Sequence, residues 1–267
     1  MDSPRIEVFF EDNLNVLKSL SSESIDLVYI DPPFNTGRTQ MRKRFHTDAN
    51  GNRVEEASYG YGDKYDNYIE DFLAPRMTEA YRILKPFGSM FFYIDYREVH
   101  YCKVMLDSVF GRESFMNEII WAYDYGARTR KRWPAKHDNI LWYAKNPDEY
   151  TFNYDAMDRI PYMAPGLVGE EKASKGKTPT DVWWHTIVSP NGKEKTGYAT
   201  QKPLGVIDRI MKVHTNEGDV VCDFFCGSGT TGESAYRLGR NAILVDSNPQ
   251  AIEVMKKRFN GMKVIWK

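Results

Sequence analysis

The sequence predicts an α/β fold built around a mostly parallel β-sheet. Apolar runs of strand length recur along the chain, and several are followed directly by segments with helical spacing or by turn residues. Alternating strands and helices are typical of parallel sheets covered by helices. With 267 residues, the chain is long enough to bury a sizeable core, in one large domain or two modest ones.

The first part of the chain contains three of these elements. Residues 25–30 form an apolar run that ends at two prolines, which cannot continue a β-ladder. Residues 68–84 carry apolar side chains at helical spacing, and a Lys-Pro-Phe-Gly sequence separates them from a predicted strand over residues 89–94. We therefore expect the first strand to end in a rigid corner.

The same alternation returns near the C-terminus. Residues 219–225 predict a buried strand, residues 227–229 its turn and residues 230–238 a helix. A further strand over residues 242–246 and a helix over residues 249–259 follow, the latter beginning with proline.

Two stretches interrupt this alternation. Residues 113–199 are rich in Trp, Tyr, Arg and Lys with little helical period, so we expect a separate or inserted region there. Residues 35–66 are polar, contain glycine and exceed an ordinary connection, which predicts a functional loop or a disordered one.

The composition is typical of a globular protein. Hydrophobic residues make up 42% of the chain, and no run approaches the roughly 18 apolar residues of a membrane span. The N-terminus lacks a secretory signal, and the three cysteines form neither a disulfide framework nor a zinc motif, so we expect a cytoplasmic protein. The histidines show no metal-ligand spacing. A net charge of -1, taken alone, argues against a nucleic-acid partner.

A turn of small residues is the first candidate binding site. Gly227-Ser228-Gly229-Thr230 occurs where a predicted strand passes to a helix, so a ligand can approach the backbone and the helix N-terminus. Alone, this pattern is more often an ordinary tight turn. Asp246 ends the next strand, where a carboxylate can accept both hydroxyls of a ribose. Together the two features indicate a nucleoside cofactor.

The charge of this site distinguishes among nucleoside cofactors. Asp223 lies at the strand end, where a carboxylate repels a pyrophosphate and attracts a cationic or amino-bearing ligand. The turn also lacks the lysine of a P-loop. These features favour S-adenosylmethionine, which carries an ammonium and a sulfonium, over NAD.

The corner Asp31-Pro32-Pro33-Phe34 is the candidate catalytic site. The prolines fix the chain so that an Asp31 oxygen and a proline carbonyl can face one point and hold one amino group. The exocyclic amine of a nucleobase is a poor nucleophile, and accepting both of its hydrogens favours the pyramidal nitrogen that attacks a methyl group. Phe34 offers a face for an extruded base. The alternative is a proline-stiffened loop with a capping Asp and a core Phe.

With these motifs the chain resembles the amino-methylating DNA methyltransferases of the β order, in which the catalytic tetrapeptide precedes the cofactor turn. Residues 11–20 resemble the segment that approaches the cofactor adenine, and Thr200-Gln201-Lys202-Pro203 resembles the element before the cofactor strand. The resemblance covers nearly the whole chain. Asp246 stands where glutamate is common, which keeps the carboxylate, and Phe224 replaces a usual proline.

The resemblance implies a Rossmann-like methyltransferase sheet with a circularly permuted motif order. Residues 1–112 would form the catalytic half, residues 113–199 an inserted target-recognition region, and residues 200–267 the cofactor-binding half of the same sheet. Lys202 would face the methionine carboxylate, and S-adenosylhomocysteine would be the product. The expected cofactor-binding residues are Asp12, Asp31, Lys202, Asp223, Phe225, Gly227, Ser228, Gly229, Thr230 and Asp246.

Basic residues cluster locally in spite of the near-zero net charge. One cluster lies in the region that the resemblance assigns to target recognition, and another follows the catalytic corner, where a solvated surface is the alternative. The expected DNA-binding residues are Arg38, Arg128, Arg130, Lys131, Arg132 and Lys136.

The leading hypothesis is a site-specific DNA adenine N6-methyltransferase, as in restriction–modification, acting on a flipped base of double-stranded DNA. In the resembled family, Asp before Pro-Pro usually accompanies adenine and Ser cytosine. The alternatives are a cytosine N4-methyltransferase, an RNA methylase with a similar corner, and a cofactor-binding but inactive DNA-recognition subunit. The absence of a cysteine after a proline argues against carbon-5 methylation of cytosine. The resemblance leaves a homodimer open.

Overall fold

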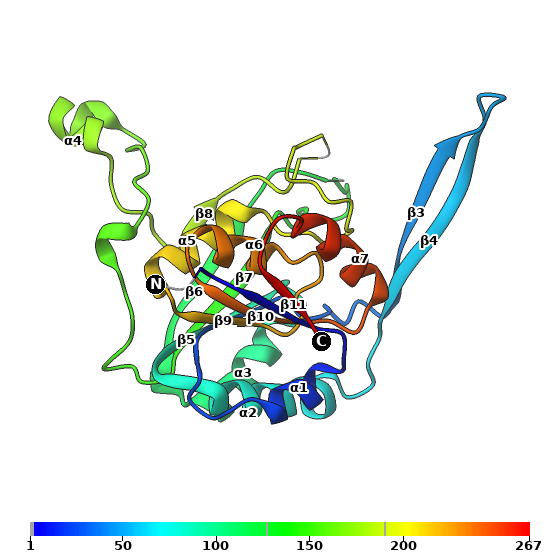
Figure 1. The fold of residues 1–267 in the computed structure, drawn as a ribbon. Coiled ribbons are helices and arrows are strands. Elements are labelled where there is room, and N and C mark those ends of the chain that lie inside the picture. The colour runs from blue at the N-terminus through cyan, green and yellow to red at the C-terminus, as the bar shows by residue number, and fades with distance from the viewer. Residues whose placement is uncertain (1–2, 127, 190) are drawn as a thin grey trace.

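A nine-stranded sheet forms the centre of the protein (Figure 1). The computed structural model describes residues 3–126, 128–189 and 191–267. In chain order, the strands of this sheet are β1 (Ile6–Phe9), β2 (Ile25–Ile30), β5 (Leu84–Ile94), β6 (Phe115–Ala122), β7 (His137–Ala144), β8 (Val182–Trp184), β9 (Val220–Asp223), β10 (Asn241–Val245) and β11 (Val264–Trp266). Their spatial order is β11-β1-β10-β9-β2-β5-β7-β6-β8. Within the described residues, only β7 runs antiparallel to its neighbours in this sheet.

Helices cover both faces of the sheet, so the predicted α/β class is confirmed (Figure 1). One face carries α1 (Asn13–Ser19), α2 (Ala74–Ile83) and α3 (Val99–Phe110), with a π-helical turn over Tyr68–Leu73. The other face carries α5 (Leu204–His214), α6 (Thr230–Arg237) and α7 (Pro249–Arg258). Short 3₁₀ turns span Arg112–Ser114, Tyr154–Ala156 and Pro165–Leu167. Among the helices of the described chain, none is long and apolar enough to cross a membrane.

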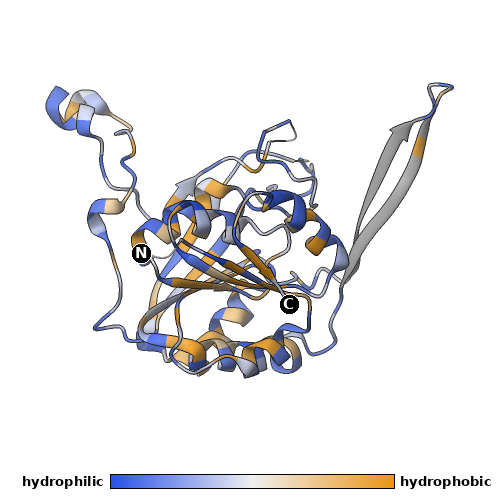
Figure 2. Cartoon of the chain, in the orientation of Figure 1, coloured by the Kyte–Doolittle hydropathy of each residue, from blue (hydrophilic) through white to orange (hydrophobic). Residues whose placement is uncertain are grey.

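The two helical layers bury opposite faces of the same strands. Successive residues of a strand point to opposite faces, so Val28 and Ile30 of β2 pack in the core beneath α1–α3. Leu27 and Tyr29 pack in the core beneath α5–α7. Figure 2 shows hydrophobic residues along the central strands, and both hydrophobic and hydrophilic residues on the helices that cover them. All six residues of β2 are buried, which explains its continuous apolar sequence.

The chain leaves the sheet in opposite directions at the carboxyl ends of β2 and β9. These strands are parallel neighbours, with Leu27 paired to Val221 and Val28 to Cys222. β9 continues into α6 above the sheet, whereas β2 continues toward α2 below it (Figure 1). A crevice opens at such a switch point in an open α/β sheet. The fold therefore brings together the ends of two strands that are far apart in sequence.

The stretch 35–66, predicted to be a loop or disordered, forms a two-stranded hairpin instead. β3 (Arg38–Thr47) and β4 (Arg53–Asp63) are antiparallel and project away from the body (Figure 1). At the turn, Asp48 accepts hydrogen bonds of 2.8 Å from the backbone of Asn50 and of Asn52, and Gly51 has φ +82°. The prediction was wrong because an Asn-Gly turn signal between two strands was overlooked. The side chains of residues 38–47, 53 and 55–62, including the predicted DNA contact Arg38, lie outside the described residues.

The sheet continues past the boundary predicted at residue 113. β6, β7 and β8 extend it beyond β5, so the expected separate region contributes three strands to the common sheet. Antiparallel pairing through β7 explains why this stretch lacks the strand–helix alternation. Between β7 and β8, α4 (Glu170–Lys175) belongs to an arm that projects from the body, on the side opposite the hairpin (Figure 1). The assignment of this region to target recognition stays a prediction.

Candidate active site

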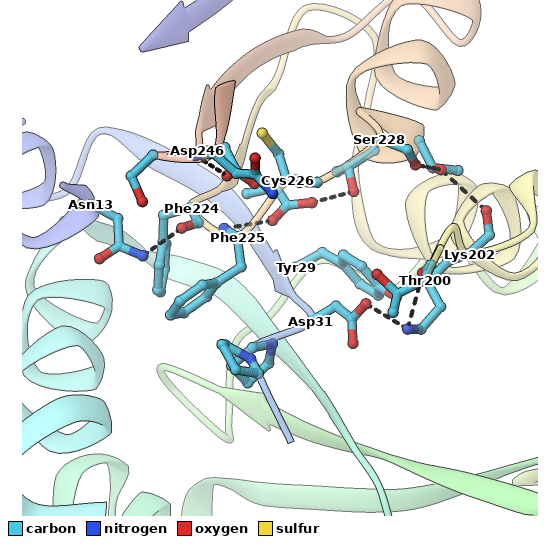
Figure 3. Close-up of a pocket in the computed structure, with 18 of the residues that line it drawn as sticks. Asn13, Tyr29, Asp31, Thr200, Lys202, Phe224, Phe225, Cys226, Ser228 and Asp246 are labelled. Carbon is cyan, nitrogen blue, oxygen red and sulfur yellow. Dashed lines mark hydrogen bonds and ion pairs between the residues drawn. The ribbon is translucent and has the colours of Figure 1, made fainter. Parts of the chain in front are cut away.

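A cavity of about 310 Å³ lies at the carboxyl edge of β2 and β9 (Figure 3). It brings together all but one of the residues predicted to bind the cofactor, together with the catalytic corner. The predicted residues that line it are Asp12, Asp31, Pro32, Pro33, Phe34, Lys202, Asp223, Phe225, Gly227, Ser228, Thr230 and Asp246. Gly229 is not among them. A Cβ on Gly229 would lie 2.6 Å from Phe259 and 2.8 Å from Met255, so helix packing explains this glycine.

The glycine turn and Asp246 are held together by backbone hydrogen bonds. One oxygen of Asp246 accepts from the amide of Gly227 at 2.8 Å, and the other from the amide of Asn248 at 2.8 Å. Gly227 has φ +48°, and a Cβ there would lie 3.1 Å from the ring of Tyr198. Burial raises the pKa of Asp246 above its usual value, while the two backbone hydrogen bonds lower it. The end of β10 thus presents an oriented carboxylate to the cavity.

Asp223 is the most deeply placed carboxylate of the cavity. It accepts hydrogen bonds from the hydroxyl of Thr231 at 2.6 Å and from the backbone amide of Phe225 at 3.1 Å. Burial, with a smaller contribution from the carboxylates of Asp31 and Asp246, raises the pKa of Asp223 to about 7, although the hydrogen bonds from Thr231 and Phe225 oppose that rise. A cationic group in the cavity would favour the charged form of Asp223.

Asp31 at the end of β2 binds the ammonium of Lys202. The distance from Lys202 Nζ to Asp31 Oδ2 is 2.5 Å, while Asp31 Oδ1 is buried without a hydrogen-bond partner in the described part of the chain (Figure 3). Burial raises the pKa of Asp31 to about 6, and Lys202 opposes that rise. The resemblance predicts that Lys202 faces the methionine carboxylate of the cofactor. In the structure its ammonium instead contacts Asp31 of the catalytic corner.

Aromatic rings surround this ion pair. Lys202 Nζ lies 4.2 Å from the ring centroid of Tyr93 and 5.2 Å from that of Phe34. The rings of Phe34 and Tyr93 stack with centroids 5.8 Å apart. A planar base beside Phe34 would therefore lie next to the carboxylate of Asp31.

The proline carbonyls of the corner differ in their contacts. The hydroxyl of Tyr68 donates to the carbonyl of Pro33. No described residue donates to the carbonyl of Pro32. Of these two carbonyls, that of Pro32 is therefore available to be the second acceptor that the sequence predicts beside Asp31, and this role stays a prediction.

Asn13, from the segment expected near the cofactor adenine, and Arg76 are two residues of the cavity wall that were not among the predicted site residues. Asn13 donates to the carbonyl of Phe224 at 2.6 Å and accepts from Arg76 Nε at 2.6 Å. Arg76 is only 7% exposed and also contacts Asp12 at 3.2 Å. These contacts tie α1 and α2 to the turn after β9. No local sequence pattern predicts these contacts of Asn13 and Arg76. An arginine on the inner face of a predicted amphipathic helix is nevertheless unusual, and it could have marked Arg76 as a residue with a buried polar partner.

The predicted DNA-binding residues other than Arg38 lie on the loop between β6 and β7, which spans residues 123–136. Ala122 pairs with His137 and Ile94 with Asn139, so this loop lies at the same edge of the sheet as the cavity. Arg128, Arg130, Lys131 and Arg132 are exposed. Lys136 instead turns back into the loop, donating to the carbonyls of residues 125 and 126 at 2.7 and 3.0 Å. The described residues contain no group of three or more side chains arranged to hold a metal ion.

Comparisons with known proteins agree with this geometry. A family model for DNA methylases of the N6/N4 type matches residues 25–257. The type II methyltransferase M.HpaI of Haemophilus parainfluenzae is 32% identical over 256 residues, covering 94% of this chain and 74% of that protein. The DNA adenine methyltransferase YhdJ of Escherichia coli (strain K12) is 29% identical over 262 residues, covering 93% and 81%. Among solved structures, M1.HpyAVI in complex with SAM has a TM-score of 0.62 at 23% identity, over 96% of this chain and 99% of that one, and so shares the fold.

Proposed function

This chain belongs to the N6/N4 family of DNA methylases, and on that premise we propose that it methylates the N6 amine of adenine at a specific site in double-stranded DNA. S-adenosylmethionine is the methyl donor. The observation that carries the proposal is the buried, unpartnered Oδ1 of Asp31, which lies in one cavity with the glycine turn, Asp223 and Asp246.

The charges of the cavity and its glycine turn support S-adenosylmethionine as the ligand. Four carboxylates line it, those of Asp12, Asp31, Asp223 and Asp246. A ligand with an ammonium and a sulfonium offsets the repulsion that the carboxylates of Asp31 and Asp246 exert on that of Asp223. Gly227 lets the ligand approach the backbone, and Asp246 is placed to accept the ribose hydroxyls. When bound, S-adenosylmethionine supplies an electrophilic methyl group.

The corner prepares the amine of the target base. Asp31 Oδ1 and the carbonyl of Pro32 accept one hydrogen each, which directs the nitrogen lone pair out of the base plane. Phe34 stacks on the base. After the nitrogen gains the methyl group, it releases one proton, and Asp31 is the neighbouring base whose pKa of about 6 suits that transfer. No covalent bond to the protein forms.

Adenine is favoured over cytosine by two independent observations. The residue before Pro-Pro is Asp31, and the relative YhdJ is named a DNA adenine methyltransferase. We further propose that residues 113–199 form an inserted target-recognition region. We also propose that the protein is cytoplasmic and that it can form a homodimer.

One experiment can determine both which base the protein methylates and at which DNA sequence. Unmethylated genomic DNA is incubated with the purified protein and S-adenosylmethionine and then read by single-molecule sequencing. N6-methyladenine at one sequence motif is expected. N4-methylcytosine would support the cytosine alternative, and cofactor binding without any methylation would support the inactive subunit.

A further inference from the structure

Trp133 is the most exposed of the six tryptophans of this chain. Its exposed fraction is 94%, whereas Trp121, Trp142 and Trp183 are less than 10% exposed and pack in the core. Tryptophan has one of the largest apolar surfaces of any side chain and strongly favours burial. Because tryptophan is enriched at interfaces, an indole that is 94% exposed on a described loop is a candidate contact for a partner.

The loop that carries Trp133 begins and ends beside the proposed base site. The hydroxyls of Tyr123, at its start, and of Tyr93, on β5, both donate to Asp138, at its end. Tyr93 in turn stacks on Phe34 of the catalytic corner. A continuous set of contacts thus connects the loop to the ring on which the target base is proposed to stack.

The loop is held on both sides of Trp133. The backbone amide of Tyr123 donates to the carbonyl of Lys136 at 3.0 Å, and Lys136 Nζ binds the carbonyls of residues 125 and 126. Arg132 contacts the hydroxyl of Tyr96, just beyond β5, at 3.3 Å. Pro134 follows Trp133 and restricts the backbone further. The indole is therefore displayed from an anchored loop.

Basic residues directly precede the exposed indole. Arg130, Lys131 and Arg132 are consecutive and exposed, so they suit a row of phosphates. Trp184, which is 74% exposed on β8, lacks this setting because Asp181, Val182 and Trp183 precede it. Charge thus favours a nucleic acid as the partner of Trp133 over an apolar protein surface.

We propose that Trp133 enters the base stack of the DNA and fills the space left by the extruded adenine. This rests on the proposed function. An adenine in a duplex loses its pairing and stacking when it is extruded, and an inserted aromatic ring restores the stacking. Trp133 thereby lowers the free energy of the extruded state without touching the reacting atoms.

The test uses two duplexes that carry the methylation site found by sequencing. In one, the target adenine is paired with thymine, and in the other it lies opposite an abasic position. Single-turnover methylation rates are measured for the wild type, for Trp133→Ala and for Trp266→Ala. Trp266 lies on β11, at the other end of the sheet, and is 41% exposed, so it serves as the matched control.

We expect Trp133→Ala to methylate the paired duplex at least about ten-fold more slowly than the wild type. The free energy of stacking one base on an aromatic ring corresponds to a factor of about that size. On the abasic duplex it should approach the wild-type rate, because that adenine has no partner to lose. Trp266→Ala should match the wild type on both duplexes.

Three results would overturn the proposal. The first is an unchanged rate of Trp133→Ala on the paired duplex, and the second is an equal loss on both duplexes. The third is a wild-type dimer that Trp133→Ala dissociates in size-exclusion chromatography, which would assign the indole to a protein interface. Failure of the wild type to methylate either duplex would instead reject the proposed function, so the two failures are distinct.

Discussion

The ammonium of Lys202 lies 2.5 Å from Asp31 Oδ2, and the other oxygen of Asp31 is buried without a described partner. Both side chains are largely buried, with exposed fractions of 11% and 16%. The lysine holds one oxygen of the carboxylate and favours its charged form, while the second oxygen stays available to accept a hydrogen. This division of roles leads directly to the first two predictions.

Asp31→Asn should lower kcat by about a hundred-fold or more, because an acceptor aimed at the reacting amine is replaced by a group that can also donate. Cofactor affinity, measured by calorimetry, should change little. Asp148→Asn, an exposed substitution away from the cavity, is the control and should behave as the wild type. Retained activity in Asp31→Asn would contradict the assigned mechanism.

Lys202→Met should move the acidic limb of the pH profile of kcat/KM to higher pH. Asp31 has a pKa of about 6 in the presence of Lys202, which lowers it, so removal of the ammonium raises the pH needed to ionise Asp31. The variant should therefore lose more activity at pH 6 than at pH 9, and Lys202→Arg should restore part of it. A profile lowered by one factor at every pH would argue that Lys202 does not tune Asp31.

Asp223→Asn should stabilise the protein in the absence of cofactor at pH 8. The pKa of Asp223 is raised to about 7 in the folded chain, so the folded state binds a proton more tightly than the unfolded state. The stability contributed by this group is present at low pH and is lost as pH rises toward 7. Urea unfolding should show a gain of about 1–3 kcal/mol for the variant at pH 8 that shrinks at pH 5. An equal difference at both pH values would exclude this titration as its source.

Asp246→Ala should weaken S-adenosylmethionine binding by about ten-fold or more, because charge-assisted hydrogen bonds to the ribose are lost. Calorimetry gives the dissociation constant, and thermal unfolding shows whether the turn at Gly227 survives the loss of its acceptor. Glu253→Ala on α7, which removes an exposed carboxylate, is the control. A dissociation constant equal to that of the wild type would reject the ribose role.

Replacing Arg130, Lys131 and Arg132 together by Gln should weaken DNA binding at every sequence. The logarithm of the association constant falls linearly with the logarithm of the salt concentration, and each lost phosphate contact should make that slope shallower by about 0.9. Fluorescence anisotropy at several salt concentrations measures that slope. Lys256→Gln on α7, an exposed lysine paired with Glu253, should leave it unchanged. An unaltered slope in the triple variant would remove the loop from the DNA contact surface.

Both halves of the site could be predicted because each has a strong local signal. The apolar run before Asp31 and the small residues after Asp223 mark strand ends, and parallel strands present their ends at one edge. Their adjacency is confirmed by the pairing of β2 with β9.

Contacts between distant side chains could not be predicted. Lys202 and Asp31 are 171 positions apart, and their meeting depends on how the segment before α5 crosses the strand ends. The buried Asn13–Arg76 contact likewise requires the packing of α1 against α2. The periodicity of apolar residues predicts which face of a helix or strand is buried. It does not predict which side chain of another element lies opposite that face.

The reversed direction of β7 has a consequence for the divergence of such proteins. Because β6 and β7 form a hairpin, its connecting loop returns to the edge that holds Asp31, without a helix or a crossover between them. Residues can be inserted into or deleted from this loop while the pairing of β5 with β7 keeps its register. The surface that we propose contacts DNA can therefore change in length while the strand end that holds Asp31 stays in place.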